Sequence, residues 1–473
     1  MSAEGLSRIA AYRSTVRRVV YGPTSVGEPT AAADDPKRGP IWRVVGGSLL
    51  TGLLGALVLT LGVFAGAPEH VISGSALLAF AFGWAMLAVL STRFTSQPQR
   101  WALVPAAFMA VVGLVLLVFS PGDHSLNPAG WVWPLLVLAL AVWMFVQVRR
   151  SLAGRVRWLL YPVIGILAVA SVGGMYERVA LTRDDGRYAM PGRLIDVGGH
   201  SLHINCTGTG SPTVVLEPGL GEPSVAMSWI APDVAATTRV CVYDRAGRGW
   251  SESASAPQNG IEVATDLHTL LERAGEPGPY VLAGHSAGGI YVLNFAHLYP
   301  QQVAGVVLLD SMHPEQYTKI DSWPAFYEVF RRASALLPSL SRLGVAHALY
   351  GTAYGDLPPL ARDEQRAFWS TPRHSRSVRD EFSKLRTAMV QARSLTNLGD
   401  RPLVVVTAQK DAQGGWMAAQ EGLAALSTNV DHRLLANATH ASLVENEAIA
   451  APSSDAIREV VNAVRSGAHV ANR

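Results

Sequence analysis

The chain has 473 residues, a length that suits two domains. Hydrophobic residues make up 49% of it, and long apolar stretches in its first part raise the mean hydropathy to +0.21. The formal charge of +3 comes mostly from arginines in and near those stretches, so it gives no reason to expect a nucleic-acid partner. No P-loop or metal-ligand spacing is found, and we expect no cofactor and no metal. Arginine far outnumbers lysine, which favours a GC-rich bacterial genome.

The first 40 residues are mostly polar and basic, which predicts a cytoplasmic tail rather than a cleaved secretory signal. Within this tail, Leu6 to Tyr21 has the pattern of a basic amphipathic helix for an anionic membrane surface. The alternative is that these charges only fix the membrane topology.

Five apolar stretches follow the tail. Each has close to 20 residues without an interior charge, enough to cross about 30 Å of hydrocarbon as a helix. They lie at about 42–66, 71–92, 101–120, 130–148 and 157–176. Buried helices of a large soluble domain are the alternative, but five in succession favour an all-α transmembrane domain at 41–177. We interpret it as an anchor.

The charges between the apolar stretches predict the orientation. The tail and the breaks beside Arg93 and Arg149 are rich in arginine, whereas the breaks at Glu69 and at 121–129 contain no Lys or Arg. By the positive-inside rule, the N-terminus is cytoplasmic. Five spans of a multi-pass cell-membrane protein then place the following domain outside the cytoplasm, after a polar linker at 178–190.

The most informative segment of the second part lies at 280–289. An apolar, strand-like run meets a G-x-S-x-G pentapeptide at 284–288, and a helical pattern follows it. A serine in a tight strand-to-helix turn adopts a strained backbone, so Gly284 and Gly288 give the room that Ser286 needs. The backbone N–H of Ala287 then points to where an oxyanion would form. An incidental serine in a glycine-rich turn is the alternative, which the flanking strand and helix disfavour.

With this segment, residues 191–466 resemble the α/β-hydrolase superfamily. Two earlier segments match in the expected order: a strand with a glycine turn at 212–220, and a D-x-x-G-x-G-x-S loop at 244–251. The resemblance implies a mostly parallel eight-stranded sheet flanked by helices, with a helical lid at about 312–395. It also implies that Leu220 supplies the second oxyanion N–H, although Glu-Pro-Gly precedes it where many relatives have His-Gly.

In this superfamily an acid and then a histidine follow the serine. His440 lies just past a short apolar strand and matches the histidine position. Asp411 follows the strand at 402–408 and is the preferred acid. Asp310, after the strand at 306–309, is the alternative acid, because some relatives place it there.

The resemblance then implies a serine hydrolase of the carboxylesterase or lipase type. Ser286 attacks a carbonyl carbon to form an acyl-enzyme, His440 accepts the proton, and Asp411 orients the imidazole. The expected partners are a small-molecule or lipid-like acyl substrate and membrane lipid. Two alternatives stay open: an acyltransferase with the same triad, and a non-catalytic domain that binds a ligand or partner.

The same resemblance bears on the two cysteines. Cys206 and Cys241 fall on strands that are antiparallel neighbours in an α/β-hydrolase sheet, so their thiols are expected within reach of a disulfide. An oxidising compartment would let that bond persist. The alternative is two buried thiols that fill positions in the sheet.

Overall fold

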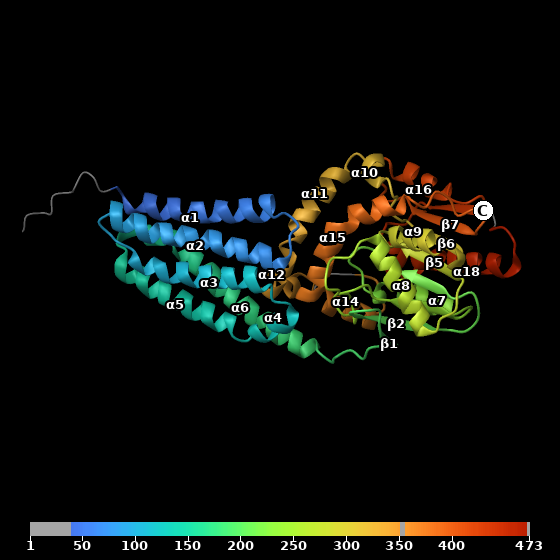
Figure 1. The fold of residues 1–473 in the computed structure, drawn as a ribbon, viewed down its shortest axis with the longest axis horizontal. Coiled ribbons are helices and arrows are strands. Elements are labelled where there is room, and N and C mark those ends of the chain that lie inside the picture. The colour runs from blue at the N-terminus through green and yellow to red at the C-terminus, as the bar shows by residue number, and fades with distance from the viewer. Residues whose placement is uncertain (1–38, 351–354, 471–473) are drawn as a thin grey trace, which may run out of the picture.

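The computed structural model describes residues 39–350 and 355–470. The predicted basic tail, including the segment Leu6 to Tyr21, therefore lies outside the described residues except for its last two positions. The described chain has two parts that lie end to end along the long axis of the molecule, a helical bundle and an α/β domain (Figure 1).

The five predicted apolar helices are confirmed. In the described residues, five helical segments are long and apolar enough to cross a membrane. They are α1 (Ile41–Leu57) with the π-helical η1 (Val58–Val63), α2 (Glu69–Phe94), α3 (Leu103–Phe119) after a 3₁₀ turn, α5 (Trp133–Ser151) and α6 (Tyr161–Asp184). The short α4 (Asp123–Ala129) links α3 to α5.

Glycines set the close packing of α2 against its two neighbours. A Cβ added at Gly83 would lie 2.8 Å from the Ser48 carbonyl oxygen of α1. On the other side, a Cβ at Gly113 of α3 would lie 2.9 Å from the Gly74 oxygen. Small residues of this kind let helix backbones approach in an apolar environment, where little else drives association.

The last bundle helix is longer than the sequence predicts. The linker was expected at 178–190, but α6 continues to Asp184. The added turns carry helix-favouring residues such as Ala180 and Leu181. They are also held from the other part of the chain, since Asp184 at their end lies 3.5 Å from the His347 ring, which Glu177 just before them also binds.

The α/β domain is built on an eight-stranded sheet with the order β1-β2-β4-β3-β5-β6-β7-β8. β1 pairs antiparallel with β2, β2 pairs antiparallel with β4, and all other pairs are parallel. The mostly parallel eight-stranded sheet that the resemblance implied is thus confirmed. The strands are β1 (Arg193–Asp196), β2 (Ser201–Thr207), β3 (Val214–Glu217), β4 (Val240–Tyr243), β5 (Tyr280–His285), β6 (Val303–Leu309), β7 (Leu403–Ala408) and β8 (Val430–Leu435).

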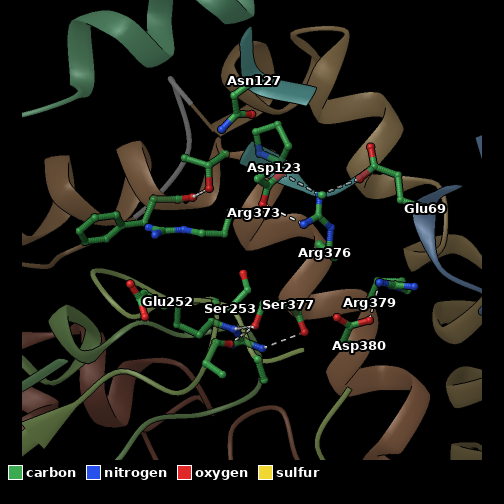
Figure 2. A pocket seen from close by; sticks show the side chains of 18 of the residues that line it. Glu69, Asp123, Asn127, Glu252, Ser253, Arg373, Arg376, Ser377, Arg379 and Asp380 are labelled. Atoms are coloured by element: carbon green, nitrogen blue, oxygen red, sulfur yellow. Dashed lines mark hydrogen bonds and ion pairs between the residues drawn. The ribbon is translucent and has the colours of Figure 1, made fainter. Parts of the chain in front are cut away.

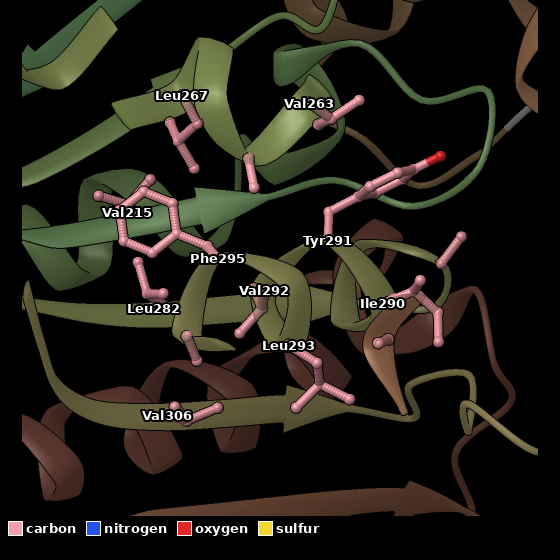
Figure 3. Close-up of a cluster of buried hydrophobic side chains, with 14 of the residues drawn as sticks. Val215, Val263, Leu267, Leu282, Ile290, Tyr291, Val292, Leu293, Phe295 and Val306 are labelled. Atoms are coloured by element: carbon pink, nitrogen blue, oxygen red, sulfur yellow. The ribbon is translucent and has the colours of Figure 1, made fainter. Parts of the chain in front are cut away.

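Helices cover both faces of the sheet. Successive side chains of a strand point to opposite faces, so neighbouring residues of one strand pack under different helices. Val215 of β3 packs in the cluster under α8 (Gly260–Ala274) and α9 (Gly288–Leu298), shown in Figure 3. Val214 packs in the cluster on the other face, under α7 (Ile230–Ala235) and α18 (Glu447–Ser466). The central strands are therefore buried on both sides.

A helical insertion between β6 and β7 lies between the sheet and the bundle (Figure 1). It contains α10 (Gln316–Lys319), α11 (Trp323–Ser334), α12 (Leu337–Arg342), α13 (Val345–Tyr350), α14 (Pro359–Trp369) and α15 (Pro372–Ala392). α15 also contacts α8 and α9 of the α/β domain, and α12 contacts α2 and α6 of the bundle. The insertion thus connects the two parts.

Candidate active site

Ser286 lies at the turn between β5 and α9, with a left-handed φ of 53°. The turn is so tight that neither Gly284 before the serine nor Gly288 after it could carry a side chain. A Cβ at Gly284 would lie 2.7 Å from the Gly289 nitrogen, and one at Gly288 would lie 2.3 Å from the Glu217 oxygen. The strained backbone persists because its surroundings hold it: Ser286 N donates to the Leu309 oxygen at 3.1 Å.

The carboxylate beside the His440 ring belongs to Asp310, which corrects the sequence-based preference for Asp411. The Nδ1 atom of His440 lies 2.7 Å from Asp310 Oδ2. Asp411 instead accepts hydrogen bonds from the backbone N–H of His440, at 3.1 and 3.2 Å. Asp411 thus binds the main chain of His440, whereas Asp310 binds its ring.

The physical reason lies in how the two aspartates leave the sheet. β6 and β7 are neighbours, so both residues emerge at the same edge. Asp310 follows β6 directly and is only 2% exposed. Its Oδ1 accepts from the Ala408 N–H at 3.1 Å and from the Trp416 Nε1–H at 2.7 Å, which aims Oδ2 at the imidazole. Asp411, three residues past the end of β7, is exposed.

A second histidine, His285, lies against the first. It immediately precedes Ser286, is 1% exposed, and its ring centre is 4.7 Å from that of His440. Its Nδ1 lies 3.3 Å from Glu222 Oε2. Burial lowers the pKa of His285, but the Glu222 carboxylate outweighs burial and leaves the pKa above its usual value. The G-x-S-x-G motif accommodates any residue at this position, so the sequence analysis did not single out this pair.

The loop that carries Leu220 is fixed on both sides. Before it, Gly219 N donates to Glu222 Oε2 at 2.7 Å, and Arg245 donates to the Gly219 oxygen at 2.5 Å. After it, Gly221 N donates to Glu381 Oε2 of α15 at 3.0 Å. The peptide groups around Leu220 therefore have little freedom, as a preorganised N–H donor requires.

Those loop contacts belong to a buried ionic network. Arg245 pairs with Glu217 and, at 3.1 Å, with Glu381, which also pairs with Arg248. The Tyr291 hydroxyl donates to Glu381 at 2.9 Å. Burial raises the pKa of Glu381, yet Arg248 and Arg245 lower it more, to about 2. The carboxylate is thus ionised at any ordinary pH.

The D-x-x-G-x-G-x-S loop is held by its aspartate. Asp244 is buried, lies 2.8 Å from His203 Nδ1, and accepts from the Ser224 and Trp250 backbone N–H groups at 2.6 and 3.2 Å. A Cβ at Gly249 would lie 2.3 Å from Asp244 Oδ2, so the loop can close over the aspartate only with glycine there. This motif is therefore structural.

Cys206 and Cys241 are directly opposed in the β2–β4 register and are joined by a disulfide. They also form, with Glu276, the group of potential metal ligands found among the described residues. The bond between the two sulfur atoms removes both thiolates, and Glu276 already binds Arg239. This group is poorly suited to hold a metal.

Comparisons with known proteins agree with this fold. Residues 212–447 match the family described as alpha/beta hydrolase fold. An uncharacterized protein of Schizosaccharomyces pombe is 25% identical over 451 residues, which cover 85% of this chain and 80% of that protein. A protein of Azorhizobium caulinodans, provisionally named carbamate hydrolase RutD, is 30% identical over 113 residues, 24% of this chain and 42% of its own.

Among solved structures, an esterase from Thermogutta terrifontis is 22% identical and has a TM-score of 0.43, covering 56% of this chain and 94% of its own. The family match and the sheet together establish the class: residues 212–447 of this chain belong to the alpha/beta hydrolase family. Its homologues include proteins named as hydrolases.

Proposed function

We propose that this protein is a membrane-anchored serine hydrolase that cleaves a carboxylic ester or a related acyl compound through an acyl-enzyme. The observation that carries the proposal is the left-handed Ser286 in its tight turn, together with the His440–Asp310 pair, whose histidine ring lies 4.7 Å from that of the adjacent His285. A structural serine would not need the strained backbone, and a surface histidine would not need a buried carboxylate.

In the proposed mechanism, Ser286 attacks the acyl carbon while His440 accepts its proton. Asp310 binds Nδ1 of His440, so Nε2 is the nitrogen left to act as base. The N–H groups of Ala287 and Leu220 receive the negative charge on the carbonyl oxygen. His440 then gives this proton to the oxygen of the leaving alcohol, and the bond between that oxygen and the acyl carbon breaks to leave the acyl-enzyme. Water attacks the acyl-enzyme with His440 again as base, and the returned proton restores Ser286 as the acid leaves.

The membrane anchoring in this proposal rests on the five apolar helices. We place the hydrolase domain outside the cytoplasm, because arginines flank alternate breaks between the helices and a disulfide persists in an oxidising compartment. A lipid-like acyl substrate fits this location.

The test is labelling of the full-length protein with a fluorophosphonate reagent, which reacts with serines that a neighbouring base activates. Wild type should be labelled and should hydrolyse p-nitrophenyl esters, whereas Ser286→Ala should do neither. Ser228→Ala is a matched control, since Ser228 is a loop serine bonded to the Val225 oxygen, and it should behave as wild type. Ester hydrolysis that survives in Ser286→Ala would exclude the serine mechanism.

A further inference from the structure

A large cavity of about 1370 Å³ lies where the bundle meets the hydrolase domain. Its walls come from the ends of α2, α3 and α6, from α4, from the loop after β4 and from α15. Figure 2 shows Glu69, Asp123 and Asn127 of the bundle facing Ser253 and Ser377 of the hydrolase domain. The ends of helices that cross the hydrocarbon core lie at the level of the lipid headgroups.

Most carboxylates around the cavity already have cationic partners. Asp123 is 2.8 Å from Arg342 and 2.7 Å from Arg376, and both arginines also pair with Glu69. Of the other acids in the wall, three are likewise paired and two are exposed. The paired acids are Glu381 with Arg245 and Arg248, Asp380 with Arg379, and Asp184 with His347; the exposed ones are Asp185 and Glu252.

Several arginines in the wall keep donors without an acceptor in the described part of the chain. Arg248 is 1% exposed and its Nη1 has no partner, and Arg379 is 4% exposed with an unpartnered Nε. Arg373 donates to the Gly249 carbonyl oxygen at 2.5 Å and makes no ion pair with a described carboxylate. Burial lowers the pKa of Arg373, because the acids around it do not offset the loss of water. Arg373 thus lacks a counter-charge among the described carboxylates, while Arg248 and Arg379, which pair with Glu381 and Asp380, each keep one donor free for a further acceptor.

We propose that this cavity binds the anionic phosphate headgroup of a membrane phospholipid, with Arg373 as the central ligand and Arg248 and Arg379 beside it. Guanidinium groups bind phosphate oxygens through paired hydrogen bonds. Small-molecule sites commonly occupy about 300–1000 Å³, so the cavity admits a headgroup with its glycerol. A soluble phosphate ester has the same chemistry, and the test separates the two sources.

The experiment uses the full-length protein in a neutral detergent, with dissociation constants measured by native mass spectrometry. Dioleoylphosphatidylglycerol is the anionic probe, and dioleoylphosphatidylcholine, which has no net charge, is the comparison. We expect tighter binding of the anionic lipid, and about tenfold or greater weakening of it in Arg373→Gln, since a charged hydrogen-bonding partner is lost. Arg373→Lys keeps the charge without the planar fork and should bind with intermediate affinity.

The matched control is Arg332→Gln, which removes a half-exposed arginine of α11 outside the cavity wall and should leave the dissociation constant unchanged. Glycerol 1-phosphate tests the soluble source. If it binds wild type as tightly as the lipid does, and if Arg373→Gln abolishes this binding, the site belongs to a free phosphate ester. Equal binding of the two lipids, or wild-type binding by a folded Arg373→Gln, overturns the proposal.

The outcome is independent of the proposed hydrolytic activity. Neither Ser286 nor His440 is among the residues that line the cavity. Ser286→Ala should therefore bind phosphatidylglycerol as wild type does, so a failure of the lipid site and a failure of the serine mechanism are distinguished.

Discussion

Asp310 and Asp411 both contact His440, but at different atoms, and this difference predicts different effects on catalysis. Asp310→Asn should lower kcat by about 10⁴, because an amide favours the wrong tautomer of the imidazole and does not stabilise the imidazolium. Asp411→Ala removes only an acceptor of the main-chain N–H and should cost less than about tenfold. Steady-state ester hydrolysis measures both. If Asp411→Ala were the more damaging change, Asp310 would not be the acid.

Glu445 predicts a pH-dependent stability near the site. Burial raises its pKa to about 7, and the nearby Glu222 adds to the shift. Since the folded state holds this proton up to about pH 7 while the unfolded state releases it near pH 4.5, ionisation of Glu445 costs stability as the pH rises between those values. Glu445→Gln removes this cost. Its unfolding temperature should therefore gain on wild type from pH 5 to pH 7.5, as measured by differential scanning fluorimetry. A constant difference across that range would contradict the assignment.

The sequence alone could not identify the aspartate that contacts the His440 ring, and the reason is physical. Both candidates end β-rich runs, and strands β6 and β7 are adjacent, so each emerges at the same edge. The choice depends on contacts that are distant in sequence, above all the Trp416 indole that binds Asp310. Ser286 could be predicted from the sequence, because its motif and the flanking strand and helix are contiguous in the chain.

At the scale of single elements, α15 connects the site to the bundle. Glu381 of this helix holds the Gly221 N–H beside Leu220, and Arg376, one and a half turns earlier, pairs with Asp123. The sequence indicated a helical insertion here, but not its contact with the bundle. Nothing in a local pattern reveals that Arg376 and Asp123, more than 250 residues apart, meet.

Glu381→Gln tests this element. The change leaves Arg245 and Arg248 short of a buried counter-charge, and we expect a loss of stability on the order of 3–5 kcal/mol. A fall in kcat larger than any change in KM should accompany it, because the loop that carries Leu220, the proposed oxyanion donor, is held through Gly221. Thermal unfolding and ester kinetics measure the two effects.

Glu328→Gln is the control for that change, since Glu328 pairs with Arg331 and Arg332 on the surface of α11. A surface pair contributes about 1 kcal/mol or less. If the two variants lost equal stability and equal activity, the buried network would have no special effect on the loop.

On the scale of the whole molecule, the disulfide is connected to the orientation of the chain in the membrane, because the bond persists only if the hydrolase domain lies in an oxidising compartment. The Cys206–Cys241 bond closes a loop with a sequence separation of 35, which should stabilise the domain by about 3–4 kcal/mol in the chain-entropy model. Protein taken from cells, unfolded without reductant and treated with iodoacetamide, should show no alkylated cysteine by mass spectrometry. After reduction both should react. Two reactive thiols before reduction would argue against a hydrolase domain in an oxidising compartment.

Ion pairs and a close backbone contact hold the helical insertion against the bundle. Arg342 and Arg376 pair with Glu69 and Asp123, and a Cβ at Gly344 would lie 2.6 Å from the Gly173 oxygen. The insertion is therefore held by the bundle on one side, while its helix α15 packs against α8 and α9 of the hydrolase domain on the other. A fragment that begins after α6 would leave Arg342 and Arg376 without these carboxylate partners. Removal of the helices to gain solubility would therefore also remove contacts that position α15, the helix whose Glu381 binds the loop beside Leu220.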